Sequence, residues 1–148
     1  MRKETEAAAR ALNVTLQSFE VERPSDLEVA FTEMRRRQIG AVLVPLDPMF
    51  NDQRGRLVSL AAQSRLPAMF GERLYVDAGG LVSYGPNYAA LYRRAAVFVD
   101  KLSRGAKPAE LPVEQPTRFE FAINLNTAKT LGLMLPQSVL LQADHLVE

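Results

Sequence analysis

Three short apolar runs of the sequence end in, or are followed directly by, side chains that can do chemistry. These side chains are two carboxylates, a guanidinium, a hydroxyl and a phenol. They belong to Asp47, to Glu72 and Arg73, and to Ser83 and Tyr84. Such groups can hold a small zwitterionic or polar aromatic molecule. A carboxylate pair such as Asp47 and Glu72 can also work as general acid and base. These residues therefore leave ligand binding and acid–base catalysis open as alternatives.

These three apolar runs have the length and composition of buried strands. They span residues 41–46, 67–70 and 81–84, and helical patterns alternate with them. This alternation predicts an α/β fold, a three-layer sandwich with a mostly parallel sheet. Because such sheets bind ligands beyond the carboxyl ends of their strands, we expect one ligand site there. The residues expected to line it are Asp47, Pro48, Met49, Glu72, Ser83 and Tyr84.

The remaining periodicity predicts further elements on both sides of these strands. Helices are expected over residues 1–12, 25–40, 51–64 and 87–102, the third capped by Asn51 or Asp52, and strands over 14–21 and 118–125. A passage with three prolines, residues 106–117, is expected to be extended. A short helix capped by Asn126 and a last helix running from Pro136 through Leu146 complete the expected order.

Composition excludes several classes of function. The 148 residues suffice for one domain with a core, and the net charge of +1 argues against a nucleic-acid partner. The sequence has no cysteine and a single histidine, His145, so thiolate chemistry is excluded and histidine-based metal sites or triads are poorly supplied. We expect no cofactor. No signal peptide or membrane segment is visible, which taken literally indicates a cytoplasmic chain.

The longest helical pattern begins at Asn87, a good N-cap residue, after the Gly85-Pro86 turn, and ends before Gly105. Its apolar side chains recur at helical spacing and so share one face. They are Tyr88, Leu91, Tyr92, Ala95, Phe98, Val99 and Leu102.

Three strings of this sequence carry a resemblance to a known family. They are SYGPN (83–87), GAKPAELPVEQPT (105–117) and FAINLNTAKTLGL (121–133). They strongly resemble the C-terminal half of ABC transporter substrate-binding proteins of the tryptophan/tyrosine type, which have the type I periplasmic binding-protein architecture. The segments EAAARALNV, SDLEVAF, AVLVPLDPMF and LAAQSRLPAMFG are similar to the preceding units of the same family, so the resemblance extends over nearly the whole chain.

The resemblance implies a two-lobed protein that closes on a small ligand, an amino acid and specifically an aromatic one, and delivers it to an ABC permease. This chain corresponds to the second lobe. Residues 1–84 are then the α/β core of that lobe without its first strand, residues 85–117 a crossover helix and return linker, and residues 118–148 the returning strand and C-terminal helices. Gly85, Pro86 and Pro116 take hinge positions. Family membership also implies a periplasmic location, in contrast to the visible N-terminus.

The helix Asn87–Leu102 should pack on the other lobe in such a protein, and without that lobe its apolar face is left open. We therefore expect a homodimer through this helix. Three alternatives to a binding lobe remain: a small enzyme that uses Asp47 and Glu72 as acid and base, a regulatory sensor lobe, and a truncated fragment without independent function. The enzyme hypothesis requires both carboxylates to converge on one pocket.

Overall fold

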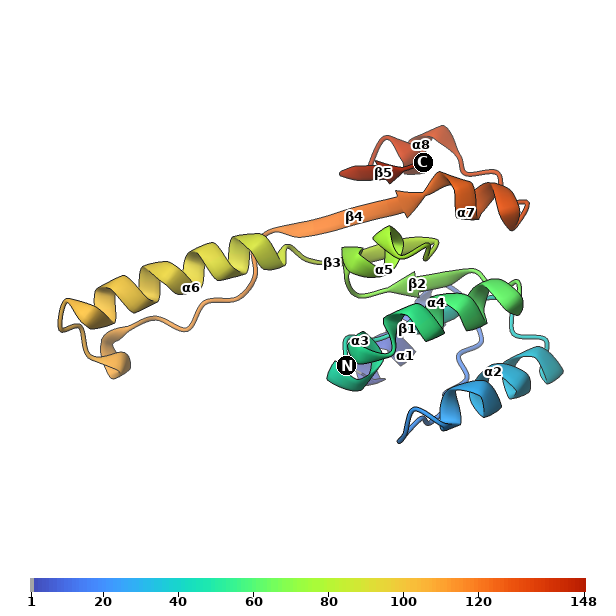
Figure 1. Ribbon diagram of the computed structural model, residues 1–148, viewed down its shortest axis with the longest axis horizontal. Helices are drawn as coiled ribbons and strands as arrows, with labels where there is room; N and C mark the ends of the chain where they lie inside the picture. Colours follow the sequence, from blue (N-terminus) through green and yellow to red (C-terminus); the bar gives the residue numbers. More distant parts are fainter. Residues whose placement is uncertain (1) are drawn as a thin grey trace.

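A five-stranded sheet forms the centre of the molecule in the computed structural model, which describes residues 2–148 (Figure 1). The strands are β1 (Val42–Val44), β2 (Ala68–Phe70), β3 (Val82–Pro86), β4 (Phe119–Asn124) and β5 (His145–Val147). They lie in the order β1-β2-β3-β4-β5. Only the β3–β4 pair is antiparallel; the other three pairs are parallel. The predicted α/β fold with a mostly parallel sheet is thus confirmed.

Helices lie on both sides of this sheet. The helices in chain order are α1 (Arg2–Ala11), α2 (Asp26–Arg36), α3 (Pro48–Asp52), α4 (Arg54–Gln63), α5 (Arg73–Asp77), α6 (Tyr88–Ser103), α7 (Leu125–Thr130) and α8 (Gln137–Leu140), with a 3₁₀ turn, η1, at Pro108–Glu110. In Figure 1, α4 and α5 lie in front of the sheet and α1 lies behind it. Helix α2 packs against α4. The strands therefore occupy the middle layer.

The core lies between the sheet and the helices in front of it. Phe70 on β2 and Tyr75 on α5 are almost fully buried, and their rings stack with centroids 4.6 Å apart. Leu27 and Phe31 of α2 and Leu57 of α4 fill the same cluster. The apolar positions on both helices recur three or four residues apart, so one face of each helix turns inward. Burial of these side chains is the main stabilising contribution.

Asn124, at the end of β4, joins the C-terminal part of the chain to this core. Its side chain is buried, and its Nδ2 donates to the carbonyl of Val76 at 3.3 Å. Its Oδ1 accepts from the backbone N–H of Thr127 at 2.9 Å and so caps α7. The Thr127 hydroxyl in turn donates to the carbonyl of Gly79 at 2.8 Å. Because a buried amide must be hydrogen-bonded, these contacts fix β4 and α7 against α5.

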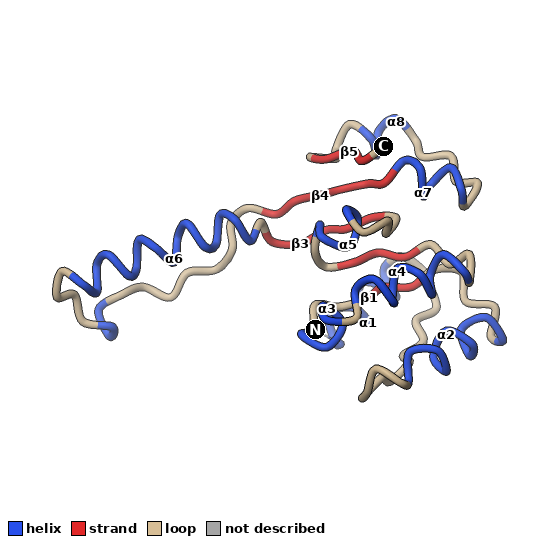
Figure 2. The backbone as a smooth tube through the Cα atoms, in the orientation of Figure 1, coloured by secondary structure: helices blue, strands red, loops and turns tan. Residues whose placement is uncertain are grey.

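Residues 87–118, which we call the arm, project from the rest of the molecule, which we call the body. Figures 1 and 2 show α6 extending away from the sheet, with the loop that returns to β4 running back alongside it. No residue of α6 is buried. The predicted helix 87–102 is confirmed within one residue at each end, with Asn87 as its cap and Gly105 just beyond its end.

Two sequence-based predictions of secondary structure are wrong. Residues 14–21 are extended but form no strand, because no strand lies beside them to accept a ladder of hydrogen bonds. The last helix stops at Leu140, and His145–Val147 instead form β5, which pairs with β4. Pairing with a strand more than twenty residues away overrides the local helical spacing.

Two predicted caps were also misplaced. Asp47, not Asn51 or Asp52, begins the helical segment after β1, and Asn124, not Asn126, caps α7.

Candidate ligand-binding site

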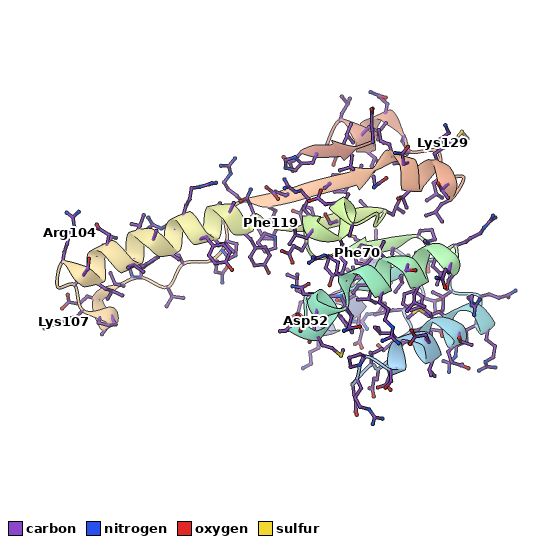
Figure 3. The ribbon with its side chains drawn as sticks, viewed as in Figure 1. Asp52, Phe70, Arg104, Lys107, Phe119 and Lys129 are labelled. Carbon is purple, nitrogen blue, oxygen red and sulfur yellow. The ribbon has the colours of Figure 1, made fainter. Side chains whose placement is uncertain are left out.

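An open cavity of about 400 Å³ lies beyond the carboxyl end of β1. It is lined by Leu46, Asp47, Pro48, Asn51, Asp52 and Tyr88. All but one of these follow β1 directly, and the exception, Tyr88, is the first residue of α6. Figure 3 shows Asp52 on the side of the body that faces the arm. The cavity therefore lies where the carboxyl end of a parallel strand meets the base of the arm, as expected for a ligand site in an α/β fold.

Asp47 is held in this cavity by a local capping interaction. Its backbone is extended, and its Oδ1 accepts a hydrogen bond from the backbone N–H of Met49 at 2.9 Å. Pro48 occupies the first turn of α3, where its missing N–H and fixed φ are tolerated. Asp47 thus performs a structural role as a helix cap, and the same carboxylate lines the cavity.

A chain of hydrogen bonds links α3 and the start of α5 next to the cavity. The Tyr75 hydroxyl on α5 donates to Asn51 Oδ1 on α3 at 2.8 Å. Asn51 Nδ2 donates to Glu72 Oε2, just before α5, at 3.2 Å. Burial, and after it the charge of Glu72, raise the pKa of Tyr75 to about 12. The phenol is therefore neutral and acts as a donor, which orients Asn51 and through it Glu72.

The carboxylate of Glu72 also influences Tyr88 at the base of the arm. Burial raises the pKa of Tyr88, and Glu72 contributes to the same shift. Asp47 and Glu72 both raise the pKa of Tyr75, which places both carboxylates in one electrostatic neighbourhood. An anionic, amide-lined depression next to a phenol suits a cationic ammonium group attached to an apolar or aromatic body.

The other expected site residues have different surroundings. Ser83 is 1% exposed, and within the described residues its hydroxyl has no hydrogen-bond partner. Tyr84 is 53% exposed and stacks on Phe119 of β4, with ring centroids 5.6 Å apart. Since successive residues of a strand point to opposite faces, these two side chains cannot share one face of β3. The structure brings Asp47, Pro48 and Glu72 into one region, and Ser83 and Tyr84 lie apart from each other.

Sequence reasoning did not single out Asn51, Tyr75 or Tyr88 as site residues. Asn51 was interpreted as a helix cap, and Tyr75 belongs to a stretch without a clear signal of either kind. The available signal was Tyr88, an aromatic residue one position after the N-cap of α6 and so at the helix end nearest the strands. Its proximity to β1 depends on the fold, however, and no local pattern reveals it.

The expected hinge residues lie where the body meets the arm. Gly85 and Pro86 are the last residues of β3 and pair with Glu120 and Phe119 of β4. A Cβ at Gly85 would lie 1.8 Å from the carbonyl oxygen of Gly71, so only glycine fits there. Pro116 is exposed and lines a groove along α6 with the arm's other returning residues.

Metal-binding clusters and membrane-spanning helices are both absent from residues 2–148. No group of acidic and histidine side chains there is placed to hold a metal ion. None of the helices described has the length and hydropathy needed to cross a membrane.

Comparison with known protein families gives one match, to a family described as ABC transporter substrate binding protein, over residues 1–147. A search of curated proteins found no match.

Three solved structures resemble this chain over almost its whole length. The ABC domain of Streptococcus pneumoniae in complex with L-Trp is 27% identical with a TM-score of 0.90, and the match covers 98% of this chain and 49% of that one. A conserved domain protein from Vibrio cholerae is 20% identical with a TM-score of 0.89, over 98% and 49% of the two chains. A substrate binding protein with adhesive properties from Clostridium difficile, in a ligand-free open structure, is 17% identical with a TM-score of 0.67, over 99% and 48%. This chain spans about half the length of the structures it matches.

Proposed function

This chain belongs to the ABC transporter substrate-binding protein family, and from that premise we propose that it is a non-catalytic lobe that binds an amino acid with an aromatic side chain. The solved structure of the family's fold that is 27% identical to this chain is described as a complex with L-Trp. The observation that carries the proposal is the Asp47-lined cavity next to the Tyr75–Asn51–Glu72 chain of hydrogen bonds.

Each group in this region has a role in the proposal. The carboxylates of Asp47 and Glu72 attract the ligand's α-ammonium group, and the phenol of Tyr88 contacts its side chain. Pro48 lines the cavity, and Met49, whose backbone N–H is held by Asp47, is proposed to contact the ligand beside it. Tyr84, which is exposed, contributes once the lobe closes over the ligand, whereas Ser83 is 1% exposed and is not proposed to touch it. The open side of the cavity at the base of the arm is where the rest of a two-lobed binding protein covers the ligand.

Ligand binding is tested by thermal-shift screening of the chain against the amino acids, followed by calorimetry of those that stabilise it. Bound ligand raises the midpoint of unfolding, and we expect tryptophan or tyrosine to give the largest rise. Glu72→Gln keeps an acceptor for Asn51 but removes the charge, so it should weaken binding at least about tenfold, the loss expected for one charged hydrogen bond.

The matched control is Glu114→Gln, which removes a carboxylate of the arm that does not line the cavity. It should leave ligand affinity unchanged. If no amino acid stabilises the chain, or if both variants bind equally well, the proposed site is wrong.

The alternative of an acid–base enzyme shares the same carboxylates. Its geometric requirement, that Asp47 and Glu72 lie near one another, is compatible with their common effect on Tyr75. We favour binding because the family is one of substrate-binding proteins. Recovery of the bound amino acid chemically unchanged after long incubation supports binding, whereas its conversion supports the enzyme.

We further propose that residues 1–84 are the core of the lobe, residues 85–117 its crossover and residues 118–148 its completing segment. Gly85, Pro86 and Pro116 then act as hinges, and the whole protein works in the periplasm with an ABC permease as its partner.

The chain alone is proposed to form a homodimer in which the apolar face of α6 is covered. Tyr92 and Val99 of α6 are exposed, and Leu91 and Phe98 line the open groove of the arm. Leu91→Lys combined with Phe98→Lys should give a monomer in sedimentation experiments. A wild-type chain that sediments as a monomer at micromolar concentration contradicts this part of the proposal.

A further inference from the structure

Four side chains from four elements meet at the base of the arm, outside the cavity. They are Arg73 at the start of α5, Asn87 before α6, Glu120 on β4 and His145 on β5. His145 is the only histidine of the chain, and its side chain is 39% exposed. Glu120 is more buried, at 21% exposed.

Asn87 connects the arm to this cluster in two ways. Its Oδ1 accepts from the backbone N–H of Ala90 at 2.6 Å and so caps α6. Its Nδ2 donates to Oε1 of Glu120. The first contact orders the start of the helix, and the second joins that start to β4. The backbone N–H of Asn87 also donates to the carbonyl of Arg118 at 2.9 Å, which holds the two ends of the arm together.

His145 lies beside the same carboxylate oxygen. Its Nε2 is 3.7 Å from Oε1 of Glu120 and 3.5 Å from Nη1 of Arg73. A neutral imidazole can accept a hydrogen bond from the guanidinium at this nitrogen. A protonated imidazole cannot accept there; it donates instead, is repelled by Arg73 and is attracted to Glu120.

The charged groups around His145 come from each element that packs on β5. Arg73 is accompanied on α5 by Asp77, with Arg73 Nε 3.4 Å from Asp77 Oδ2. On β4 the group is Glu120. Asp144, next to His145 in sequence, is engaged by the backbone N–H of Phe121 at 2.8 Å. Helix α7, which also packs on β5, carries one charged residue, Lys129, and it lies at the end of the sheet away from the arm (Figure 3).

We propose that Glu120 is a positioning residue for the arm and that protonation of His145 controls it, because Asn87 and protonated His145 compete for the same oxygen of Glu120. At neutral or alkaline pH, Glu120 holds Asn87 and the base of α6 is fixed to the sheet. When His145 gains a proton, it donates to Glu120, the Asn87 contact weakens, and the arm moves more freely about Gly85 and Pro86. This inference does not depend on the nature of the ligand.

The test measures the distance between the arm and the body. Because the sequence has no cysteine, Val29→Cys on α2 and Val99→Cys on α6 give two defined positions for spin labels, and both are exposed. Labelled chain is diluted with unlabelled chain so that only distances within one molecule are measured. We expect the distribution of distances to be wider at about pH 5 than at about pH 8. Labels at Val29 and Leu141, both on the body, should give the same distribution at the two pH values.

Two variants distinguish control of the arm by His145 and Glu120 from a general effect of acid. His145→Gln should keep the narrow distribution at both pH values, and Glu120→Leu, which removes the acceptor for Asn87, should give the wide distribution at both. An unchanged distribution in the otherwise wild-type chain, or widening that persists in His145→Gln, overturns the proposal. Circular dichroism checks that each variant is folded. If His145→Gln does not fold, Glu120→Leu decides, since a pH-dependent distribution in that variant contradicts control of the arm through Glu120.

Discussion

The body and the arm are built from similar residues but are held together differently. The body buries aromatic and aliphatic side chains from helices and strands that are distant in sequence, such as Leu27, Phe70 and Ile123. The arm contains Tyr92, Phe98 and Val99, yet none of its helical residues is buried. Its shape depends on the Asn87 cap, on an ion pair between Arg94 and Glu114, and on the cations of Arg94 and Lys101 over the Phe98 ring.

This difference shows that apolar content alone does not make a core. An isolated amphipathic helix is marginally stable in water and gains most of its stability from packing. A sixteen-residue helix with an open apolar face is therefore a surface suited to being covered by something else. The body has a core of its own, whereas the arm offers an exposed apolar surface.

The largest expected effect comes from one substitution made in both regions. Phe70→Ala removes a ring that is 1% exposed and stacked on Tyr75, so the free energy of unfolding should fall by about 3–5 kcal/mol. Phe98→Ala on the arm, measured at a concentration at which the chain is monomeric, should change it by less than about 0.5 kcal/mol, as for surface substitutions generally. Denaturant titration followed by circular dichroism measures both. Equal losses would mean that the arm is part of one cooperative core.

The junction between the two regions should be the next most sensitive. At Gly85 an added Cβ would lie 1.8 Å from the carbonyl oxygen of Gly71, and neither backbone can move without disturbing β2 and β3. Gly85→Ala should therefore destabilise the chain by about 2–3 kcal/mol, the cost of overpacking.

The control for this change is Gly55→Ala. Gly55 lies in α4, where a new Cβ meets no atom within 4 Å, and alanine is the better helix former. It should stabilise the chain by about 0.5–1 kcal/mol. A neutral Gly85→Ala would show that the approach of β3 to Gly71 is not a constraint on the fold.

A pH titration distinguishes a buried phenol of the body from an exposed one of the arm. Burial, together with Glu72, raises the pKa of Tyr75 from 10.0 to about 12, so the folded state holds the phenolic proton more tightly than the unfolded state. The resulting stabilisation is complete below pH 10 and is lost as the pH rises toward 12. We expect a loss of up to about 2 kcal/mol across that interval.

Tyr75→Phe should remove this alkaline dependence, at the cost of about 1 kcal/mol for the hydrogen bond to Asn51. Tyr92→Phe, at an exposed position of α6, should leave both the stability and its pH profile unchanged. Ultraviolet titration should show a late ionisation that disappears in Tyr75→Phe. If all four ionise together and Tyr75→Phe retains the wild-type profile, the phenol is not buried as described.

Local sequence patterns correctly predicted the elements whose formation depends on nearby residues. The apolar runs before Asp47 and Glu72 became parallel strands, and the periodicity after Asn87 became α6. Local sequence patterns failed where pairing with a neighbouring strand decides whether a segment becomes a strand. Residues 14–21 have strand-forming side chains but no neighbouring strand, whereas His145–Val147 became a strand because β4 lies beside them.

The candidate site was likewise predictable only for residues that a local sequence signal marks. Asp47 could be located from sequence because it directly follows an apolar run typical of a buried strand, but its role as the cap of α3 was missed. The link from Tyr75 through Asn51 to Glu72 joins residues more than twenty positions apart, and its members are adjacent only through the parallel register of β1 and β2. Ser83 and Tyr84 are neighbours in sequence, but the alternation of a strand gives them opposite surroundings.

The smallest expected effect lies within the arm itself, and it tests whether the arm has stability of its own. The ion pair between Arg94 and Glu114 joins α6 to the returning loop across twenty residues of sequence, and both side chains are partly exposed. Such pairs contribute less than about 1 kcal/mol and are weakened by salt. Arg94→Ala should therefore leave the global unfolding of the body unchanged, because the body has no contact with this pair.

It should instead speed hydrogen exchange of the amides in α6 by a few-fold, the change that corresponds to a loss of about 0.5–1 kcal/mol in local opening. Arg93→Ala, one position away and outside the ion pair, is the matched control. Faster exchange in both regions after Arg94→Ala would show that the arm and the body unfold together. Faster exchange confined to α6 supports an arm that opens independently, which is the property a mobile crossover between two folded units requires.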